Sequence, residues 1–345
     1  MENKHGHKKN KILFVTKKRL TSGGLPYAGG LSSGLANSVK FVVDMLNKNH
    51  IEAIHEDVID GNCIDRVIHE HRPTHCIIEA IWVTPSKFIE LKKLHKDVTF
   101  VVRVHSEIPF LSMEGMSMEW LLVYLEIGVK VGFNSKRTYE DFKALVYNKK
   151  DVLYMPNYYK VTKEPNPGAF NNSIINVGCF GAIRPFKNQL VQAVAAIEYA
   201  KLNGLKLAFH INTERVEGNG GPVLKNLRST FNMMDHATLV EHPWLPHNEF
   251  IDLVKTMDIG LQMSYSETFN IVSADFINNN IPIVGSDEIE FLNSAYIAES
   301  NNTKDIIKKM GSAISGRRFN LQYLNKLLLK KQVKEAEKEW IKLYK

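Results

Sequence analysis

Residues 174–188 read IINVGCFGAIRPFKN, and this stretch decides how the chain folds. The run 174–180 is mostly apolar and rich in β-branched residues, which predicts a strand buried in a parallel sheet. Gly178 and Gly181 then mark a loop, and residues 189–202 are predicted to form a helix. A strand, a glycine-containing loop and a helix in this order predict one unit of a parallel α/β sheet.

The chain before this stretch shows the same alternation. Residues 11–16 predict a buried strand, a glycine-rich stretch occupies 22–34, and apolar residues recur at helical spacing over 36–46. Further strands are predicted at 51–53, 75–79, 98–105 and 129–133. Helix-like stretches lie between them, so we expect a parallel sheet with helices on both faces.

A boundary separates the two halves. Residues 158–172 contain Pro165, Pro167, Gly168 and several asparagines without clear periodicity, as is typical of a linker. Beyond it, strands are predicted at 174–180, 205–211, 237–240, 259–263 and 281–284, and helices at 189–202, 250–257 and from 273 to 278. A long amphipathic helix is predicted over 321–345, and its lysines are read as a solvated face. The fold class is therefore α/β, with two units joined by a linker.

Composition excludes several classes of protein. The 345 residues suit about two domains, and 44% hydrophobic with 23% charged residues is ordinary for a globular chain. No apolar run is long enough to span a membrane, and the N-terminus lacks the pattern of a signal peptide. The three cysteines, at 63, 76 and 179, are too far apart for a paired motif, which favours a reducing, cytoplasmic compartment.

The charge balance leaves the partner open. A formal net charge of +7 is compatible with nucleic acid, an anionic membrane surface or a phosphorylated small molecule. It does not choose between them.

Polar residues follow several predicted strands. The glycine-rich loop at 23–34 could bring the backbone close to a ligand, although it is neither a Walker A loop nor a G-x-G-x-x-G fingerprint. Arg103 and His105 stand where the strand 98–105 ends, which is the edge of a parallel sheet where ligands bind. For Arg103 we expect a local hydrogen-bond network instead.

Two segments of the second half carry charge at loop positions. Arg184 and Lys187 lie near a predicted helix start, where cations oppose the helix dipole unless an anion such as a diphosphate lies between them. Glu267 and Asp275 follow the strand at 259–263. A helix beginning near Phe269 would direct free amides at a sugar or phosphate oxygen beside Glu267, and Asp275 would reach a ribose diol.

These segments resemble the family-4-type retaining glycosyltransferases, which have the GT-B architecture. The family's E-x7-E motif, followed by a helix and a strand ending in Pro-Val, is matched by Glu267-x7-Asp275 and by IPIVGS at 281–286. The other matches are the basic pair Arg184 and Lys187, Pro156-Asn157 at the domain junction, the loop histidine His105, and WLPHNEF at 244–250.

The chain departs from the family pattern at four places. The second carboxylate is Asp275 instead of Glu, Thr268 stands where Gly is usual, and Phe276 stands where Ala is usual. Asparagines replace the usual glycine before Pro282. These departures indicate a divergent branch.

The resemblance implies two Rossmann-like domains facing a cleft, at 1–158 and 159–320, with a helix at 321–345 returning to the N-terminal domain. It implies a hexosyl- or pentosyltransferase that uses a UDP- or GDP-linked sugar as co-substrate and needs no cofactor. Retention of anomeric configuration without a protein nucleophile is also implied. The chain has no Asp-x-Asp motif, which fits metal-independent chemistry.

The resemblance also implies roles for individual residues. Arg184 and Lys187 would neutralise the diphosphate, Glu267 would hold sugar hydroxyls, and His105 would contact the sugar from the N-terminal domain. The remaining donor-binding residues would be Gly181, Trp244, Leu245, Phe269, Asn270, Ile271 and Asp275. Gly29 and Gly30 would line the acceptor side near the phosphates.

Alternatives remain for the reaction and the acceptor. A nucleotide-sugar epimerase of GT-B fold or a non-catalytic nucleotide-sugar or glycan-binding module would share the donor site. The first half also resembles glycosyltransferases of large bacteriophages, some of which modify DNA. A hydroxymethylated pyrimidine in duplex DNA is therefore one expected acceptor, reached by base flipping in a host cytoplasm, and a glycan or lipid-linked glycan is the other.

Overall fold

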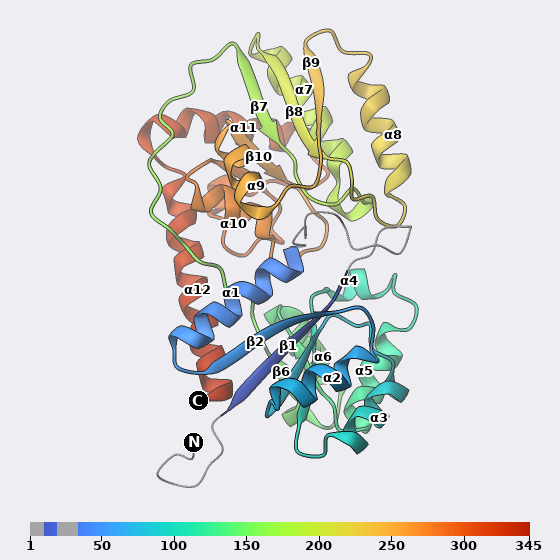
Figure 1. Ribbon diagram of the computed structural model, residues 1–345. Helices are drawn as coiled ribbons and strands as arrows, with labels where there is room; N and C mark the ends of the chain where they lie inside the picture. Colours follow the sequence, from blue (N-terminus) through green and yellow to red (C-terminus); the bar gives the residue numbers. More distant parts are fainter. Residues whose placement is uncertain (1–9, 19–33) are drawn as a thin grey trace. The chain divides into compact units, whose positions relative to one another are not determined.

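The computed structural model describes residues 10–18 and 34–345. They form two compact units, which are considered separately. The first unit takes the described residues up to Lys160 together with Val333–Lys345, and the second is Val161–Gln332. Each unit is built on one parallel sheet (Figure 1), which confirms the predicted α/β class.

The sheet of the first unit has six parallel strands in the order β2-β1-β3-β4-β5-β6. Their register places Ile77 opposite Val101 and Glu79 opposite Arg103. The inner strands 11–17, 75–79 and 99–104 are buried on both faces and are mostly apolar, whereas the edge strand 52–58 reads EAIHEDV and is largely half-buried or exposed. The strands are β1 (Lys11–Lys17), β2 (Glu52–Val58), β3 (His75–Glu79), β4 (Thr99–Val104), β5 (Lys130–Phe133) and β6 (Val152–Tyr154).

Helices cover both faces of this sheet, and alternate residues of a strand point to opposite sides. Leu13 and Val15 of β1 pack in one core with α2, α3, α5 and α6, whereas Ile12 and Phe14 pack in a second core with α1 and the end of α12. The helices are α1 (Gly34–Lys48), α2 (Cys63–His71), α3 (Pro85–Leu94), the short α4 (Ile108–Leu111), α5 (Ser117–Glu126), α6 (Lys136–Leu145) and η1 (Lys149–Asp151).

The last turns of α12 (Tyr323–Tyr344) complete the first unit. Trp340 is fully buried, lies 5.7 Å from the ring of Phe14, and donates its indole N–H to the Pro156 carbonyl oxygen at 2.7 Å. Tyr344 meets the ring of His75 edge-on at 5.1 Å. The C-terminal residues are therefore part of the core that forms around β1.

The second unit has a five-stranded parallel sheet in the order β11-β10-β7-β8-β9. Its strands are β7 (Ile174–Gly178), β8 (Lys206–Asn212), β9 (Ala237–His242), β10 (Ile259–Gln262) and β11 (Ile283–Gly285). Its helices are α7 (Gln189–Leu202), α8 (Gly220–Phe231), α9 (His247–Lys255), α10 (Ile271–Asn278) and α11 (Thr303–Gly316), with 3-10 turns η2 (Pro185–Lys187), η3 (Ser294–Tyr296) and η4 (Arg317–Phe319).

Some elements differ from the sequence-based expectation. The helices α8 and α11 and the three-residue strand β6 were not anticipated, because α8 starts with the turn-forming run Gly220-Gly221-Pro222 and β6 is too short for a periodic pattern. Helix α9 begins at His247, three residues before the predicted start at 250. Helix α10 begins at Ile271, between the predicted start at 273 and the start near Phe269 that was considered for Glu267, with Asn270 as its N-cap.

The segment after Lys160 has no helix or strand over 161–173, yet asparagines at the end of α10 bind it. The Thr162 amide donates to Asn278 Oδ1 at 2.7 Å, and Asn278 Nδ2 donates to Thr162 Oγ1 at 2.9 Å. Asn280 Nδ2 donates to the Glu164 carbonyl oxygen at 2.6 Å. Asn280 has a φ of 57°, a left-handed conformation that asparagine tolerates after a helix. The asparagines before Pro282 thus attach the linker to the second unit.

Among the helices of the described residues, none combines the length and the apolar character needed to cross a membrane.

Candidate active site

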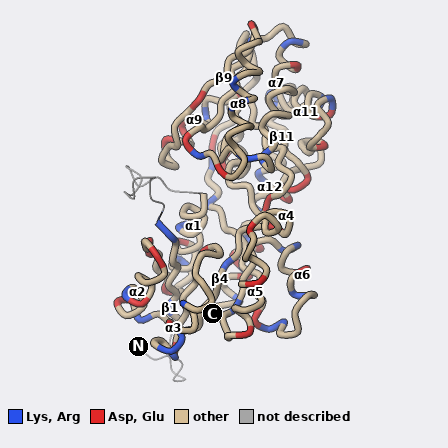
Figure 2. Tube along the Cα trace, turned by 90° about the vertical axis from the view of Figure 1, so that its right-hand side faces the viewer, with Lys and Arg blue, Asp and Glu red and all other residues tan. Residues whose placement is uncertain are grey.

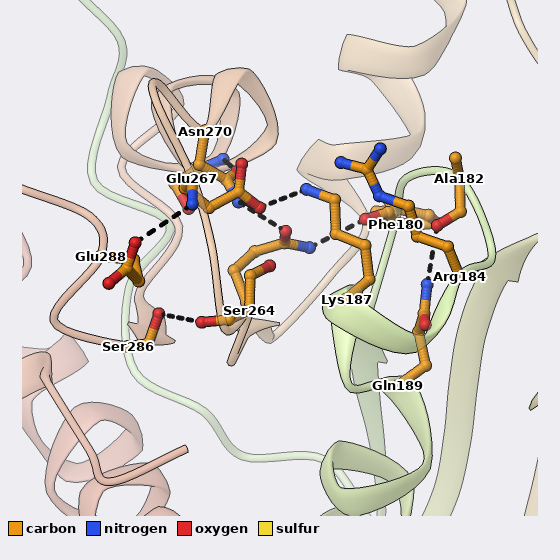
Figure 3. Close-up of polar contacts among 12 residues, drawn as sticks. Phe180, Ala182, Arg184, Lys187, Gln189, Ser264, Glu267, Asn270, Ser286 and Glu288 are labelled. Carbon is orange, nitrogen blue, oxygen red and sulfur yellow. Dashed lines mark hydrogen bonds and ion pairs between the residues drawn. The ribbon is translucent and has the colours of Figure 1, made fainter. Parts of the chain in front are cut away.

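Two loops meet at the carboxyl edge of the second sheet. Strands β7 and β10 are hydrogen-bonded neighbours, with Gly178 opposite Gly260, so the loops that follow them leave the sheet side by side. The first loop carries Arg184 and Lys187, and the second carries Glu267 and Asn270 (Figure 3). Ligands of parallel α/β sheets bind at this edge, which makes it the candidate site of the unit.

The centre of this site is an ion pair between Lys187 and Glu267, which are 80 residues apart in the sequence. The side chains are only 12% and 8% exposed. Burial alone would raise the pKa of Glu267, but the Lys187 ammonium holds that pKa below its usual value. The site therefore presents a fixed carboxylate and a fixed ammonium side by side.

Asn270 orients Glu267. Its Nδ2 donates to Glu267 Oε1 at 3.1 Å and to Gln262 Oε1 at 2.8 Å, and its Oδ1 accepts the Ser273 amide at 2.8 Å as the cap of α10. Gln262 in turn donates to the Phe180 carbonyl oxygen at 2.9 Å, back in the first loop (Figure 3). The N-terminus of α10 is thus connected to both loops through amide side chains.

Phe269 and Ile271 frame this cap. Ile271 is the first residue of α10, so its amide belongs to the helix N-terminus. Phe269 lies before the cap, and its ring packs 5.0 Å from the ring of Phe291. The helix N-terminus therefore lies two residues after Phe269 and two residues before the predicted start at 273.

Arg184 is connected to the loop that carries the predicted donor-binding residues Trp244 and Leu245. Its Nη1 lies 3.4 Å from Glu217 Oε2, and Glu217 Oε1 accepts the Arg215 Nε–H at 2.5 Å. The Arg215 guanidinium lies 5.2 Å from the centre of the Trp244 ring, and the Trp244 amide donates to Glu214 Oε2 at 2.8 Å. Arg184 is thus linked to Trp244 through the charged side chains of Glu217 and Arg215. Leu245, the next residue of the same loop, is half-buried.

The loop that follows β7 adopts backbone conformations that favour glycine at position 181 and asparagine at position 188. Gly181 has a φ of 120°, which L side chains rarely adopt, and its amide donates to Asn212 Oδ1 at 3.2 Å. Asn188 adopts a left-handed conformation with a φ of 55°. Its Nδ2 donates to the Met263 carbonyl oxygen at 3.1 Å and to that of Ser300 at 2.6 Å, which holds the loop against the end of β10.

Asp275 lies one turn into α10 and is 1% exposed. Its Oδ1 is 2.9 Å from Nε2 of His247, the first residue of α9. Burial would lower the pKa of His247, but the hydrogen bond and the charge of Asp275 raise it overall. Asp275 is therefore paired with a half-buried imidazole.

The first unit carries His105 after β4, at the carboxyl edge of its own sheet. His105 Nε2 contacts the Glu79 carboxylate, and Asn134 Nδ2 lies 3.2 Å from His105 Nδ1. A neutral ring protonated at Nε2 satisfies both contacts. Burial and the nearby Arg103 lower the pKa of His105, and the opposing effect of Glu79 does not outweigh them.

Arg103 lies in a buried hydrogen-bond network, as expected. It is paired with Glu79 at 3.2 Å and donates to the Met155 and Pro156 carbonyl oxygens at 2.9 and 3.0 Å and to Asn157 Oδ1 at 2.6 Å. The network holds the Pro156-Asn157 motif against the end of β4.

Gly29 and Gly30 lie outside the described residues. Sequence reasoning did not single out Gln262, Asn188, Glu217, Glu288 or His247. The amide of Glu267 donates to Glu288 Oε2 at 3.2 Å. Asn188 and His247 lie inside the quoted stretches 174–188 and 244–250, and Gln262 lies in the predicted strand before Glu267, and these positions are the signals that could have indicated the three residues. In residues 10–18 and 34–345, no three His, Cys, Asp or Glu side chains cluster closely enough to hold a metal ion.

No protein-family model matches the chain, and no curated protein matches its sequence. Solved structures do match its fold. The chain resembles Anabaena HepE in complex with UDP and glucose with a TM-score of 0.64 at 12% identity, over 97% of this chain and 99% of HepE. It resembles the apo structure of OtsA with a TM-score of 0.68 at 9% identity, again over 97% and 99%.

A third match is a mutant of S. aureus TarM in complex with fondaparinux, α-GlcNAc-glycerol and UDP. Its TM-score is 0.60 at 15% identity, over 78% of this chain, and the match spans 55% of the TarM chain, about half its length. Together these similarities define the fold class as GT-B, with two Rossmann-like domains.

Proposed function

We propose that the chain is a glycosyltransferase that takes its sugar from a nucleotide-sugar donor bound to the second unit. The observation that carries the proposal is the largely buried Lys187–Glu267 ion pair with Arg184 in the same loop as Lys187, at the sheet edge where ligands bind. It is supported by the fold, which HepE and TarM share in complexes with UDP.

The donor diphosphate would lie between Arg184 and Lys187. A diphosphate is an anion with several acceptor oxygens, and charge-assisted hydrogen bonds to guanidinium and ammonium groups bind it strongly. As the bond between the sugar and the diphosphate breaks, negative charge grows on the leaving oxygen, and the same two cations would stabilise it. The Ile271 amide at the start of α10 would add a neutral donor, and Gly181, which has no side chain, would let the diphosphate approach the backbone closely.

Glu267 would accept hydrogen bonds from the sugar hydroxyls. Its depressed pKa keeps it ionised, and Asn270 holds it in place. We assign retention of anomeric configuration to the reaction on the basis of the resemblance, with no protein nucleophile. Phe269, packed on Phe291, would support the loop that carries Glu267.

The nucleoside would lie on the other side of the diphosphate. Trp244 and Leu245 would contact the base, and the Asp275–His247 pair would bind the ribose diol. In this arrangement Asp275 compensates for its shorter side chain by acting together with His247, which reaches further. His105 would contact the donor sugar through Nδ1, where a sugar hydroxyl would take the place of Asn134 Nδ2 as the hydrogen-bond donor.

The test is incubation with a panel of UDP- and GDP-linked sugars, followed by analysis of nucleotide and sugar. Release of free nucleotide with the sugar transferred or hydrolysed is the expected result. Epimerised donor would establish the epimerase instead, and binding without turnover, measured as a rise in melting temperature, would establish the binding module. The acceptor is sought with DNA containing hydroxymethylated cytosine or uracil beside unmodified DNA, and with glycans.

A further inference from the structure

The first unit contains a pocket that no predicted site residue lines. It has a volume of about 330 Å³ and lies where the loops after β2 and β3 leave the carboxyl edge of the sheet. Small-molecule sites begin at roughly 300 Å³, so the pocket has room for one compact ligand. Its walls are Trp82, Asn62, Thr84, Ser86, Lys87 and Glu90.

Trp82 is held in place by its only polar atom. Its indole N–H donates to the Glu79 carbonyl oxygen at 2.9 Å, at the end of β3. With that donor used, the indole offers a ligand only its aromatic surface. The half-buried ring packs partly against the core of the first unit, and Lys17 Nζ lies 5.9 Å from the ring centre. The part of the indole that lines the pocket is the aromatic surface that a ligand can reach.

The loop that presents Trp82 is constrained at both ends. Ala80 has a φ of 69°, a left-handed conformation that costs a non-glycine residue energy and that clusters at functional sites. The Ala80 amide donates to the Arg103 carbonyl oxygen at 2.9 Å. The Tyr124 hydroxyl donates to the Val83 carbonyl oxygen beyond Trp82. The indole is thus positioned by the end of the sheet on one side and by α5 on the other.

The polar wall opposite carries no excess charge. Lys87 Nζ is 2.8 Å from Glu90 Oε1, so the one cation and the one anion of the pocket neutralise each other. The hydroxyls of Thr84 and Ser86 are 3.0 Å apart, and each keeps further hydrogen-bonding capacity. Both positively and negatively charged residues occur on α2 and α3, the helices that follow the pocket loops (Figure 2).

We propose that this pocket binds a saccharide ring of the acceptor, with the ring stacked on Trp82 and its hydroxyls on the polar wall. A pyranose has an apolar face of C–H groups and a rim of hydroxyls, which matches an aromatic surface facing neutral polar groups. The proposal rests on the proposed function, because it assigns the acceptor class. Glu79 links the two features, since its carbonyl oxygen orients Trp82 and its carboxylate orients His105.

The charges of the pocket favour a saccharide over DNA. Duplex binding depends on unpaired lysines and arginines that neutralise phosphates. Here Lys87 is paired with Glu90, and Asp60 stands beside the pocket, where its carboxylate accepts the Asn62 amide at 2.8 Å. With Lys17 near Trp82 counted, the two cations around the pocket are matched by the carboxylates of Glu90 and Asp60, so a polyanion would meet no excess of positive charge.

The test is saturation-transfer NMR with methyl glycosides of glucose, galactose, mannose and N-acetylglucosamine at millimolar concentration, with UDP added in excess to occupy a donor site. Transfer to the ring C–H protons of at least one glycoside is expected. Trp82→Ala should weaken that binding at least about tenfold, the effect of losing an aromatic contact worth about 1.4 kcal/mol. Tyr147→Ala is the matched control, because Tyr147 is a fully exposed aromatic side chain of the same unit.

A second variant guards against misfolding of Trp82→Ala. Ser86 is exposed at the pocket rim, so Ser86→Arg should leave the fold intact, place a long side chain across the pocket beside Glu90, and abolish the transfer. No transfer from any glycoside, or equal transfer in wild type and both variants, would overturn the proposal. So would displacement of the glycosides by a short DNA duplex that binds through the same residues.

Failure of the saccharide pocket can be distinguished from failure of the proposed donor site. UDP binding is measured independently as a shift in melting temperature that Arg184→Ala reduces. If UDP does not bind but a glycoside binds through Trp82, the proposed function fails and the saccharide pocket stands. If UDP binds and no glycoside does, the pocket assignment fails alone.

Discussion

The ring of Phe276 occupies the space that a side chain at Gly260 would need. A Cβ built on Gly260 would lie 2.8 Å from two atoms of that ring, and one on Gly178 of the neighbouring strand would lie 2.7 Å from its tip. Phe276 is fully buried and packs 6.1 Å from the ring of Phe180. Phe276 stands where the family that the sequence resembles usually has alanine. Gly178 of β7 and Gly260 of β10 leave the space that this larger ring needs, and both strands lead into the loops of the candidate site.

Gly260→Ala should therefore destabilise the second unit by about 1–3 kcal/mol, because the added methyl overpacks the core. Phe276→Leu in the same chain should restore part of that loss, since the smaller side chain makes room. The free energies of unfolding of the wild type, the two single variants and the double variant give the coupling energy between positions 260 and 276.

The control is Gly311→Ala. Gly311 lies inside α11, and its nearest neighbour would be an atom of Tyr199 at 3.7 Å, so alanine there should be neutral or slightly stabilising. Additive effects of Gly260→Ala and Phe276→Leu would show that the two sites do not compete for space.

Arg184→Ala and Lys187→Ala should each lower turnover at least about a hundredfold, because each removes one cation from the diphosphate and the leaving group. Turnover is measured as nucleotide release from the donor accepted by the wild type. Near-normal turnover in both single variants and in the double variant would remove this loop from the active site.

Lys187 and Glu267 should also be coupled in stability. Loss of either partner leaves a largely buried charge unpaired, whereas replacement of both by neutral groups leaves none. We expect the Lys187→Met and Glu267→Gln variants to be less stable than their double variant or equal to it. A double variant that loses the full sum of the two single effects would contradict the ion pair.

The His247–Asp275 pair predicts a pH effect on the alkaline side. The pKa of His247 is raised in the fold, so its contribution to stability is fully present below the usual value of 6.5 and is lost as pH rises through the raised pKa. We therefore compare the free energies of unfolding of the wild type and of His247→Gln. The advantage of the wild type should shrink as the pH rises from about 5 to 8. A difference that stays constant or grows over this range would reject the charged pair.

His210 predicts the opposite behaviour on the acid side. Burial and the stacked ring of His242, whose Nε2 is 2.9 Å from His210 Nδ1, lower the pKa of His210 from 6.5 to about 4. The unfolded chain binds the proton first, so stability falls as pH drops from 6.5 towards 4. Denaturant unfolding should show a shallower pH slope in His210→Asn than in wild type, and identical slopes would refute the assignment.

Chelation tests the metal requirement. The absence of an Asp-x-Asp motif from the chain predicts that EDTA leaves turnover largely unchanged. Complete loss of turnover, restored only by added manganese or magnesium, would show that the diphosphate is neutralised by a metal ion and not by Arg184 and Lys187 alone.

The alternation of strands and helices could be predicted from the sequence because it is a local property. Parallel strands such as 75–79 and 174–178 are mostly apolar, and glycines and prolines mark the loops between elements. The same local logic located Arg184, Lys187 and Glu267 at strand ends. Short or atypical elements such as β6 and α8 escaped it, because three residues or a Gly-Gly-Pro start carry no periodic signal.

The meeting of Lys187 with Glu267 was decided by the tertiary structure alone. It requires β10 to lie next to β7, although β8 and β9 come between them in the sequence. Strand order is set by how helices and strands pack as a whole, and no local pattern encodes it.

By itself, the sequence determined that this protein has two parallel α/β units and which of their loops carry charge, because periodicity and residue type act over a few residues. The tertiary structure decided which distant side chains became partners: Glu267 for Lys187, His247 for Asp275, and two glycines for Phe276. The physical reason is that pairing and close packing depend on the contact of surfaces far apart in the chain, which only the folded arrangement brings together.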